Sequence, residues 1–147
     1  MNESGETPLR RSFSNLEAFR AFAGAFARRL SPGDVVALSG PLGSGKTTFV
    51  RAAVETLHHA DQTTSPTFAF WHRYEGRPPI DHLDLFRIDD PSERTELGLE
   101  APFEDDASIV FVEWWRNLPE LLPARRYEID IEGAGSAART LVLREPA

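Results

Sequence analysis

The sequence predicts an α/β fold, in which a mostly parallel β-sheet is flanked by helices. Two apolar runs, residues 35–39 and 109–112, are typical of strands that are buried on both faces. A glycine-rich loop, SGPLGSGKTTFV at residues 39–50, follows the first run and leads into a helical segment. Near the end of the chain, an alternating segment and a short apolar segment flank a turn, which predicts a C-terminal β-hairpin.

Length and composition limit the possible classes of protein. The chain has 147 residues, of which 41% are hydrophobic, so we expect a single domain over residues 1–147 with residues 1–12 flexible. Its net charge of −7 argues against a free-standing nucleic-acid-binding protein, because the surface as a whole repels polyanions. The absence of cysteine excludes disulfides and thiolate sites. No apolar run approaches a membrane span, so we expect a cytoplasmic protein without membrane contact.

The remaining elements follow from periodicity and turn residues. The stretch from Ser14 to Glu17 has capping-box spacing, and apolar residues then recur at steps of three and four, which predicts a helix over residues 15–30 with its aromatic stripe in the core. A second helix should run from the glycine loop to about Leu57, and a short one should span residues 117–122. Strands are expected before Asp84, around residues 127–131, and at residues 141–143 as an edge strand.

The glycine-rich loop predicts a phosphate-binding site. Residues 40–47 match G-x-x-x-x-G-K-S/T at every fixed position, and the strand before and helix after the loop disfavour a chance match. Lys46, the only lysine, would neutralise the β- and γ-phosphates, and Thr47 offers a hydroxyl to Mg²⁺. The start of the helix favours the same anion. The candidate nucleotide-binding residues of this segment are Gly40, Leu42, Gly43, Ser44, Gly45, Lys46, Thr47 and Thr48.

Two carboxylates follow predicted strands. Glu113 ends the apolar run at 109–112, where a carboxylate could hold Mg²⁺, although it could also be a surface residue that ends a strand. Asp84 lies near the end of another strand, where it could orient the attacking water or complete the metal shell. Asp81, Asp89 and Asp90 are expected to cap turns or the helix after Pro91. His82 lacks a second histidine at ligand spacing, which favours a structural, hydrogen-bonded role.

A hydroxyl-rich segment lies between the loop helix and the next strand. Thr64, Ser65 and Thr67 surround Pro66 and could form a switch loop that senses the γ-phosphate. The same composition is equally typical of an ordinary loop. The residues alone leave both interpretations open.

Five motifs follow one another along the chain: SGPLGSGKTT at 39–48, SPTF at 65–68, HLDLFR at 82–87, ELGLE at 96–100 and VFVEW at 110–114. In this order they resemble the TsaE (YjeE) family of small bacterial P-loop ATPases, which are required for forming threonylcarbamoyladenosine in tRNA. The likeness covers residues 14–132. It departs from the family pattern at Phe86, where tyrosine is common, and at Trp115 and Arg116, where proline and glutamate are common.

The resemblance implies a mixed sheet of about seven strands, ATP with Mg²⁺ as cofactors, and slow hydrolysis that depends on partners. The implied partners are TsaD and TsaB, and tRNA would be reached only through their complex. Residues carried over by motif are Lys46, Asp84 and Glu113 as catalytic, Thr47 and Glu113 at the metal, Trp114 beside the nucleotide, and Thr64 to Thr67 in a switch-like loop.

Three other classes of function are alternatives to an ATPase. A P-loop kinase for a small metabolite usually carries an arginine-bearing lid, and no such insertion is evident. A guanine-nucleotide switch would need an N-K-x-D motif, which cannot exist where Lys46 is the only lysine, so ATP is favoured over GTP. A non-hydrolysing module that binds nucleotide only to order a surface remains the further alternative.

Overall fold

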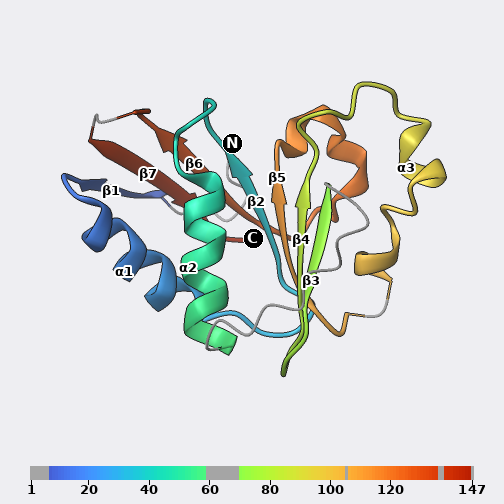
Figure 1. The fold of residues 1–147 in the computed structure, drawn as a ribbon, viewed down its shortest axis with the longest axis horizontal. Helices are drawn as coiled ribbons and strands as arrows, with labels where there is room; N and C mark the ends of the chain where they lie inside the picture. Colours follow the sequence, from blue (N-terminus) through green and yellow to red (C-terminus); the bar gives the residue numbers. More distant parts are fainter. Residues whose placement is uncertain (1–6, 59–69, 105, 136–137, 147) are drawn as a thin grey trace.

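A computed structural model describes residues 7–58, 70–104, 106–135 and 138–146. Its helices and strands alternate along much of the chain, as expected for an α/β fold (Figure 1). The elements are β1 (Leu9–Phe13), α1 (Leu16–Ala27), β2 (Val35–Ser39), α2 (Lys46–His58), β3 (Trp71–Tyr74), β4 (Ile80–Asp84), α3 (Glu93–Glu96), β5 (Ile109–Glu113), β6 (Tyr127–Glu132) and β7 (Arg139–Arg144). Short 3₁₀ turns lie at Ala101–Phe103, Trp115–Asn117 and Pro119–Leu121.

The strands of the described residues form one seven-stranded sheet in the order β1-β7-β6-β2-β5-β4-β3. Its centre is parallel, since β2 pairs in parallel with both β6 and β5, and β4 pairs in parallel with β5. The outer pairings, β1 with β7, β6 with β7 and β3 with β4, are antiparallel. The mixed sheet and the C-terminal hairpin of β6 and β7 are therefore confirmed.

The N-terminal edge of the sheet differs from the expectation. Residues 9–12, which we expected to be flexible, form most of β1 and pair with β7 from Leu9 to Phe13. The prediction that residues 141–143 form an edge strand is therefore wrong, because β1 covers the outer side of β7. The alternation in β1 is weak because its side chains are mostly exposed, so only pairing with a distant strand defines it.

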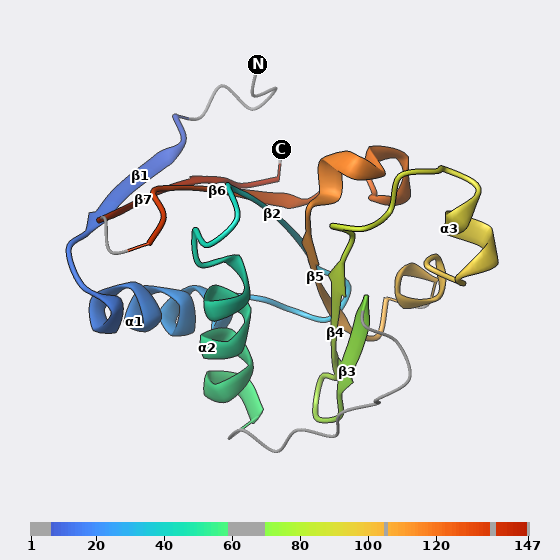
Figure 2. The same cartoon turned by 45° about the horizontal axis from the view of Figure 1, so that its top comes forward.

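Helices α1 and α2 lie together on one side of β1, β7 and β6 (Figure 2). Between helices and sheet lies a core in which Phe19 and Phe26 of α1 contact Phe49 of α2, so the aromatic stripe is core as expected. A second apolar cluster on the opposite face joins residues of β2, β4 and β5 to the segment after β5. None of the helices in the described ranges is long and apolar enough to cross a membrane.

Three local predictions need correction. The N-cap of α1 is Asn15 rather than Ser14, because the Asn15 side chain accepts the Ala18 N–H at 2.8 Å. The helix expected at 117–122 is replaced by two 3₁₀ turns, since Pro119 lacks an N–H and disfavours a helical conformation at Leu118, whose φ is −150° and ψ is 64°. Asp81 caps no turn; it is buried within β4 and accepts the Trp71 indole N–H at 2.9 Å.

Candidate nucleotide-binding site

A cleft of about 530 Å³ lies where β2, β4 and β5 end. Parallel strands place their carboxyl ends at one edge of a sheet, and this edge is where open α/β sheets bind ligands. The cleft also receives the connection between β1 and α1 and the turn between β6 and β7. Its lining residues are Phe13, Ser14, Asn15, Leu16, Phe19, Leu42, Gly43, Ser44, Gly45, Lys46, Thr47, Thr48, Asp84, Phe86, Glu113, Trp114, Gly135 and Arg139.

The predicted phosphate loop forms one wall of this cleft, between β2 and α2. Its backbone needs glycine at both ends: Gly40 has φ +151° and Gly45 has φ +112°, a region that other residues rarely adopt. A Cβ at Gly40 would also lie 2.5 Å from the Ile131 carbonyl oxygen. Because α2 begins at Lys46, its first backbone N–H groups have no partner within the helix and are available to an anion.

Gly40 differs from the other candidate residues of the loop, because it does not line the cleft. Its carbonyl instead accepts the Lys46 ammonium at 2.7 Å, and the Pro41 carbonyl accepts it at 3.1 Å. The Lys46 side chain is buried, with Nζ 4.3 Å from the centre of the Trp114 ring. Burial lowers the pKa of Lys46, and the nearby carboxylates of Glu113 and Asp84 oppose this shift.

Glu113 is the centre of a buried hydrogen-bonded group, so it is not a surface residue that merely ends a strand. The Thr47 hydroxyl lies 2.9 Å from Glu113 Oε2 and 3.1 Å from Oε1. On the other side, His82 Nε2 lies 2.6 Å from Oε2, with both side chains buried. An ionised carboxylate only accepts hydrogen bonds, so His82 donates from Nε2. The structural role expected for His82 therefore consists in holding Glu113.

Asp84 lies beside Glu113 in the sheet, because β4 and β5 pair in parallel with these two residues in register. One of its oxygens, Oδ1, accepts the Phe86 N–H at 3.0 Å. Burial raises the pKa of Asp84, the Phe86 N–H lowers it, and the charge of Glu113 raises it. The structure thus brings the two predicted acids to the same end of the cleft as Lys46.

Trp114 adopts an uncommon left-handed backbone conformation, with φ 59° and ψ 35°. Its ring packs against Phe86, with ring centres 4.8 Å apart, and on the ammonium of Lys46. This arrangement puts Phe86, one departure from the family pattern, on the wall of the cleft as a purely apolar contact.

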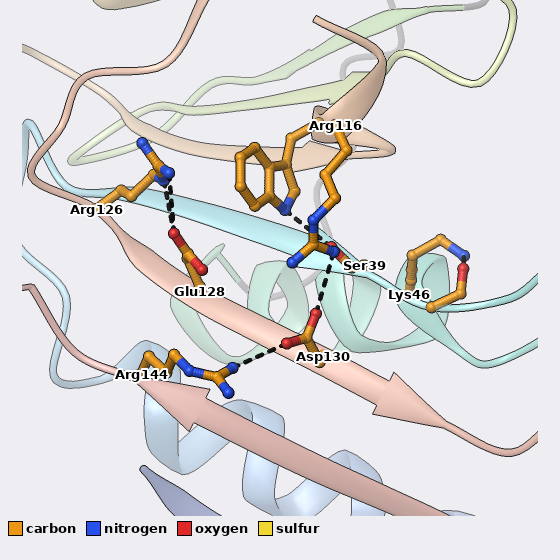
Figure 3. Close-up of polar contacts among 9 residues, drawn as sticks. Ser39, Lys46, Arg116, Arg126, Glu128, Asp130 and Arg144 are labelled. Atoms are coloured by element: carbon orange, nitrogen blue, oxygen red, sulfur yellow. Dashed lines mark hydrogen bonds and ion pairs between the residues drawn. The ribbon is translucent and has the colours of Figure 1, made fainter. Parts of the chain in front are cut away.

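The other two departures, Trp115 and Arg116, anchor the segment after β5 to the end of β2. The Trp115 indole N–H donates to Ser39 Oγ at 2.9 Å, and Arg116 donates to the same oxygen at 2.6 Å. Figure 3 shows Arg116 reaching from Ser39 to Asp130, which Arg144 contacts from its other side. Because Ser39 directly precedes the phosphate loop, this network fixes Trp114 relative to the loop.

Two contributors to the cleft were not identified from the sequence. The first is Arg139 of β7, which lines the cleft and contacts the phosphate loop. One signal was available: Arg139 alternates with Leu141 and Leu143, so a charge stands on the apolar face of the strand. The connection from Phe13 to Leu16 also contributes. The predicted switch residues Thr64, Ser65 and Thr67 lie outside the described residues.

The model of one protein family, described as threonylcarbamoyl adenosine biosynthesis protein TsaE, matches residues 13–141. The chain belongs to the TsaE family. A relative named tRNA threonylcarbamoyladenosine biosynthesis protein TsaE from Bacillus subtilis is 38% identical over 128 residues, which cover 86% of this chain and 79% of the relative. A TsaE protein from Rickettsia bellii is 35% identical, covering 79% of this chain and 81% of its own length.

The TsaE fold is also found among solved structures. The crystal structure of Bacillus subtilis YdiB matches with a TM-score of 0.77 and 32% identity, covering 96% of this chain and 87% of YdiB. The resemblance to the TsaE family and its α/β fold are thereby confirmed.

The chemistry of the donor groups fits a magnesium nucleotide. The hydroxyl of Thr47 and the carboxylate of Glu113 are hard oxygen donors in direct contact, and Mg²⁺ in nucleotide sites commonly uses one or two such side chains together with phosphate oxygens and water. The described residues contain no cluster of three or more histidine, cysteine or acidic residues that could hold a metal by itself. A site of this kind therefore depends on the nucleotide for the rest of its ligands.

Proposed function

We propose that this TsaE-family protein binds ATP with Mg²⁺ and hydrolyses it as a component of the machinery that forms threonylcarbamoyladenosine in tRNA. The observation that carries the proposal is the contact between Thr47 and Glu113 at the start of α2, beside the buried ammonium of Lys46. The names of the relatives support the biosynthetic role. The cytoplasm is the compartment that this role implies.

The chain's own residues would bind the phosphates from several sides. Backbone N–H groups of the loop and of the first turn of α2 would donate to phosphate oxygens, and Lys46 would supply a positive charge between the β- and γ-phosphates. The carbonyls of Gly40 and Pro41 accept the Lys46 ammonium, which supports this role by holding it at the phosphate loop. Thr47 and Glu113 would hold Mg²⁺, which supplies charge neutralisation at the β- and γ-phosphates when it is bound.

Asp84 is the candidate for orienting the attacking water. Glu113 is already engaged by Thr47 and His82, whereas only Oδ1 of Asp84 accepts a backbone N–H among its hydrogen bonds to described residues. A carboxylate in this position can accept a hydrogen bond from a water molecule and align that water with the γ-phosphate. We therefore assign the metal to Glu113 and the water to Asp84.

Apolar side chains form a rim around the opening of the cleft, which is unusual for a site that binds a polyanion. Docking of TsaB and TsaD on these side chains would explain them. Leu42, at the tip of the loop, is 70% exposed, and Leu16 is 62% exposed. Both side chains line the cleft together with Phe86. A partner that covered this rim would exclude water and complete the site, so turnover by the free protein should be slow. Because the net charge of −7 repels a polyanion, we expect the partners rather than this chain to contact tRNA directly.

The decisive experiment measures ATP hydrolysis by the purified protein with Mg²⁺, alone and with the cognate TsaB–TsaD complex and tRNA. We expect strong stimulation by the complex and loss of this stimulation in Lys46→Ala. The reason is that the P-loop cation contributes about 3 kcal/mol or more to electrostatic stabilisation of the transition state. Arg28→Ala, which removes an exposed charge beyond α1, is the matched control. Fast turnover without partners would favour a metabolite kinase, and no turnover in either condition would favour a non-hydrolysing module.

A further inference from the structure

Arg139, the first residue of β7, reaches the phosphate loop from across the sheet. Its Nε donates to the Ser44 carbonyl oxygen at 2.7 Å, and its Nη2 donates to the Gly43 carbonyl oxygen at 3.1 Å. The same Nη2 also donates to the Gly135 carbonyl oxygen at 2.9 Å, in the turn before β7. One guanidinium therefore ties two consecutive loop carbonyls to the β6–β7 hairpin.

Two cations thus hold the loop at its two ends. Lys46 takes the carbonyls of Gly40 and Pro41, and Arg139 takes those of Gly43 and Ser44. The Ser44 N–H donates within the loop to the Pro41 carbonyl at 3.0 Å. A nucleotide that drew Lys46 toward its phosphates would leave the Arg139 contacts as the attachment of the loop to the rest of the fold.

The Ser44 carbonyl controls the orientation of a phosphate-binding group. In a trans peptide the C=O and the following N–H point in opposite directions, so a fixed Ser44 carbonyl fixes the direction of the Gly45 N–H. Gly45 lines the cleft, and its N–H has no acceptor among the described residues. Because residues 43 and 45 are glycines, the neighbouring peptide planes can rotate freely. A ligand that had to orient them alone would lose binding free energy to conformational entropy.

We infer that Arg139 is a positioning residue for the phosphate loop, which orients the Ser44–Gly45 peptide toward the nucleotide before the nucleotide binds. This inference rests on the proposed function. The planar guanidinium suits the role, because it presents donors in a fixed fork that spans two neighbouring carbonyls, whereas a lysine ammonium is a single point. Loss of this preorganisation should weaken nucleotide binding.

The test compares wild type, Arg139→Lys and Arg139→Gln, with Arg11→Lys on the neighbouring strand as the control, since Arg11 is exposed on β1. The dissociation constant of ATP with Mg²⁺ is measured by calorimetry well below each variant's own melting midpoint, so that lower stability alone cannot weaken binding. We expect both Arg139 variants to raise this constant about tenfold or more, and Arg11→Lys to leave it unchanged.

Two further measurements separate positioning from stability. The backbone amide resonance of Gly45 should shift in Arg139→Lys, while the amides of α1 stay in place. In partner-stimulated hydrolysis, KM should rise and kcat should change less than about threefold, because preorganisation acts on binding.

The outcomes distinguish the two proposals. Wild-type affinity in both Arg139 variants, or an unshifted Gly45 amide, would overturn the positioning role and leave the proposed function intact. Absence of nucleotide binding by the wild type would overturn both.

Discussion

The hydroxyl of Thr47 and the carboxylate of Glu113 are in direct contact, at 2.9 Å and 3.1 Å to the two carboxylate oxygens. The two residues are 66 positions apart in the sequence and come from α2 and β5. Their contact joins the phosphate loop to the strand that supplies the acid. We propose that the two residues act as one unit in binding magnesium, and its two parts can be tested separately.

Thr47→Ala should lower the affinity for ATP in the presence of Mg²⁺, because it removes the hydroxyl that we propose as a metal ligand and the hydrogen bond that this hydroxyl donates to Glu113. We expect a loss of about tenfold or more, whereas Thr47→Ser, which keeps the hydroxyl, should stay close to wild type. Titration with ATP in Mg²⁺ and in EDTA checks this. The variants should converge in EDTA; a deficit of Thr47→Ala that persisted there would mean that the hydroxyl does not act through the metal.

Asp84→Asn and Glu113→Gln should fail in different ways. Glu113→Gln should raise the Mg²⁺ concentration that supports half-maximal hydrolysis, because the amide is a poorer ligand for a hard cation. Asp84→Asn should lower partner-stimulated kcat by about 100-fold or more while ATP affinity stays near wild type. Steady-state kinetics at several Mg²⁺ concentrations checks both. The reverse pattern would exchange the two roles, and normal turnover in both variants would make the acids structural.

Trp114 should report nucleotide binding by fluorescence. Its ring is 4.3 Å from Lys46 Nζ, so a ligand that draws this cation toward its phosphates changes the electrostatic surroundings of the indole. We expect ATP with Mg²⁺ to change the tryptophan emission of the wild type and of Trp71→Phe, but not of Trp114→Phe. A full fluorescence response in Trp114→Phe would show that another tryptophan senses the nucleotide and would contradict the proposed movement of Lys46 beside Trp114.

Ser39→Ala should destabilise the fold, because two donors converge on the Ser39 hydroxyl. Trp115 is only 6% exposed, so its indole N–H would lose its acceptor within the protein. Leaving a buried donor unpaired costs about 1–3 kcal/mol in the free energy of unfolding. Urea denaturation of Ser39→Ala, Trp115→Phe and the double variant measures the coupling. Additive losses would show that the Ser39–Trp115 bond contributes nothing of its own.

The local sequence pattern was sufficient to predict those features whose interacting residues are neighbours in the chain. The phosphate loop, Lys46 and Thr47 could be read directly because the strand, glycines and helix that form the site follow one another. The buried strands β2 and β5 were equally clear, since an apolar run needs no partner to be recognised. Glu113 could be identified as a candidate in the same way, because it directly follows the apolar run of β5 in the sequence.

Features that depend on strand order and register could be established only from the folded structure. Whether β1 or β7 forms the edge, whether His82 or another residue contacts Glu113, and whether Arg139 reaches the loop all depend on pairings between distant segments.

A strand carries its alternating faces in its sequence, but not the identity of its neighbours. The amino-acid sequence was sufficient to predict the phosphate loop and most of the elements around it. The folded sheet determined which distant side chains hold that loop and its acids in place, because only strand register brings them within hydrogen-bonding distance.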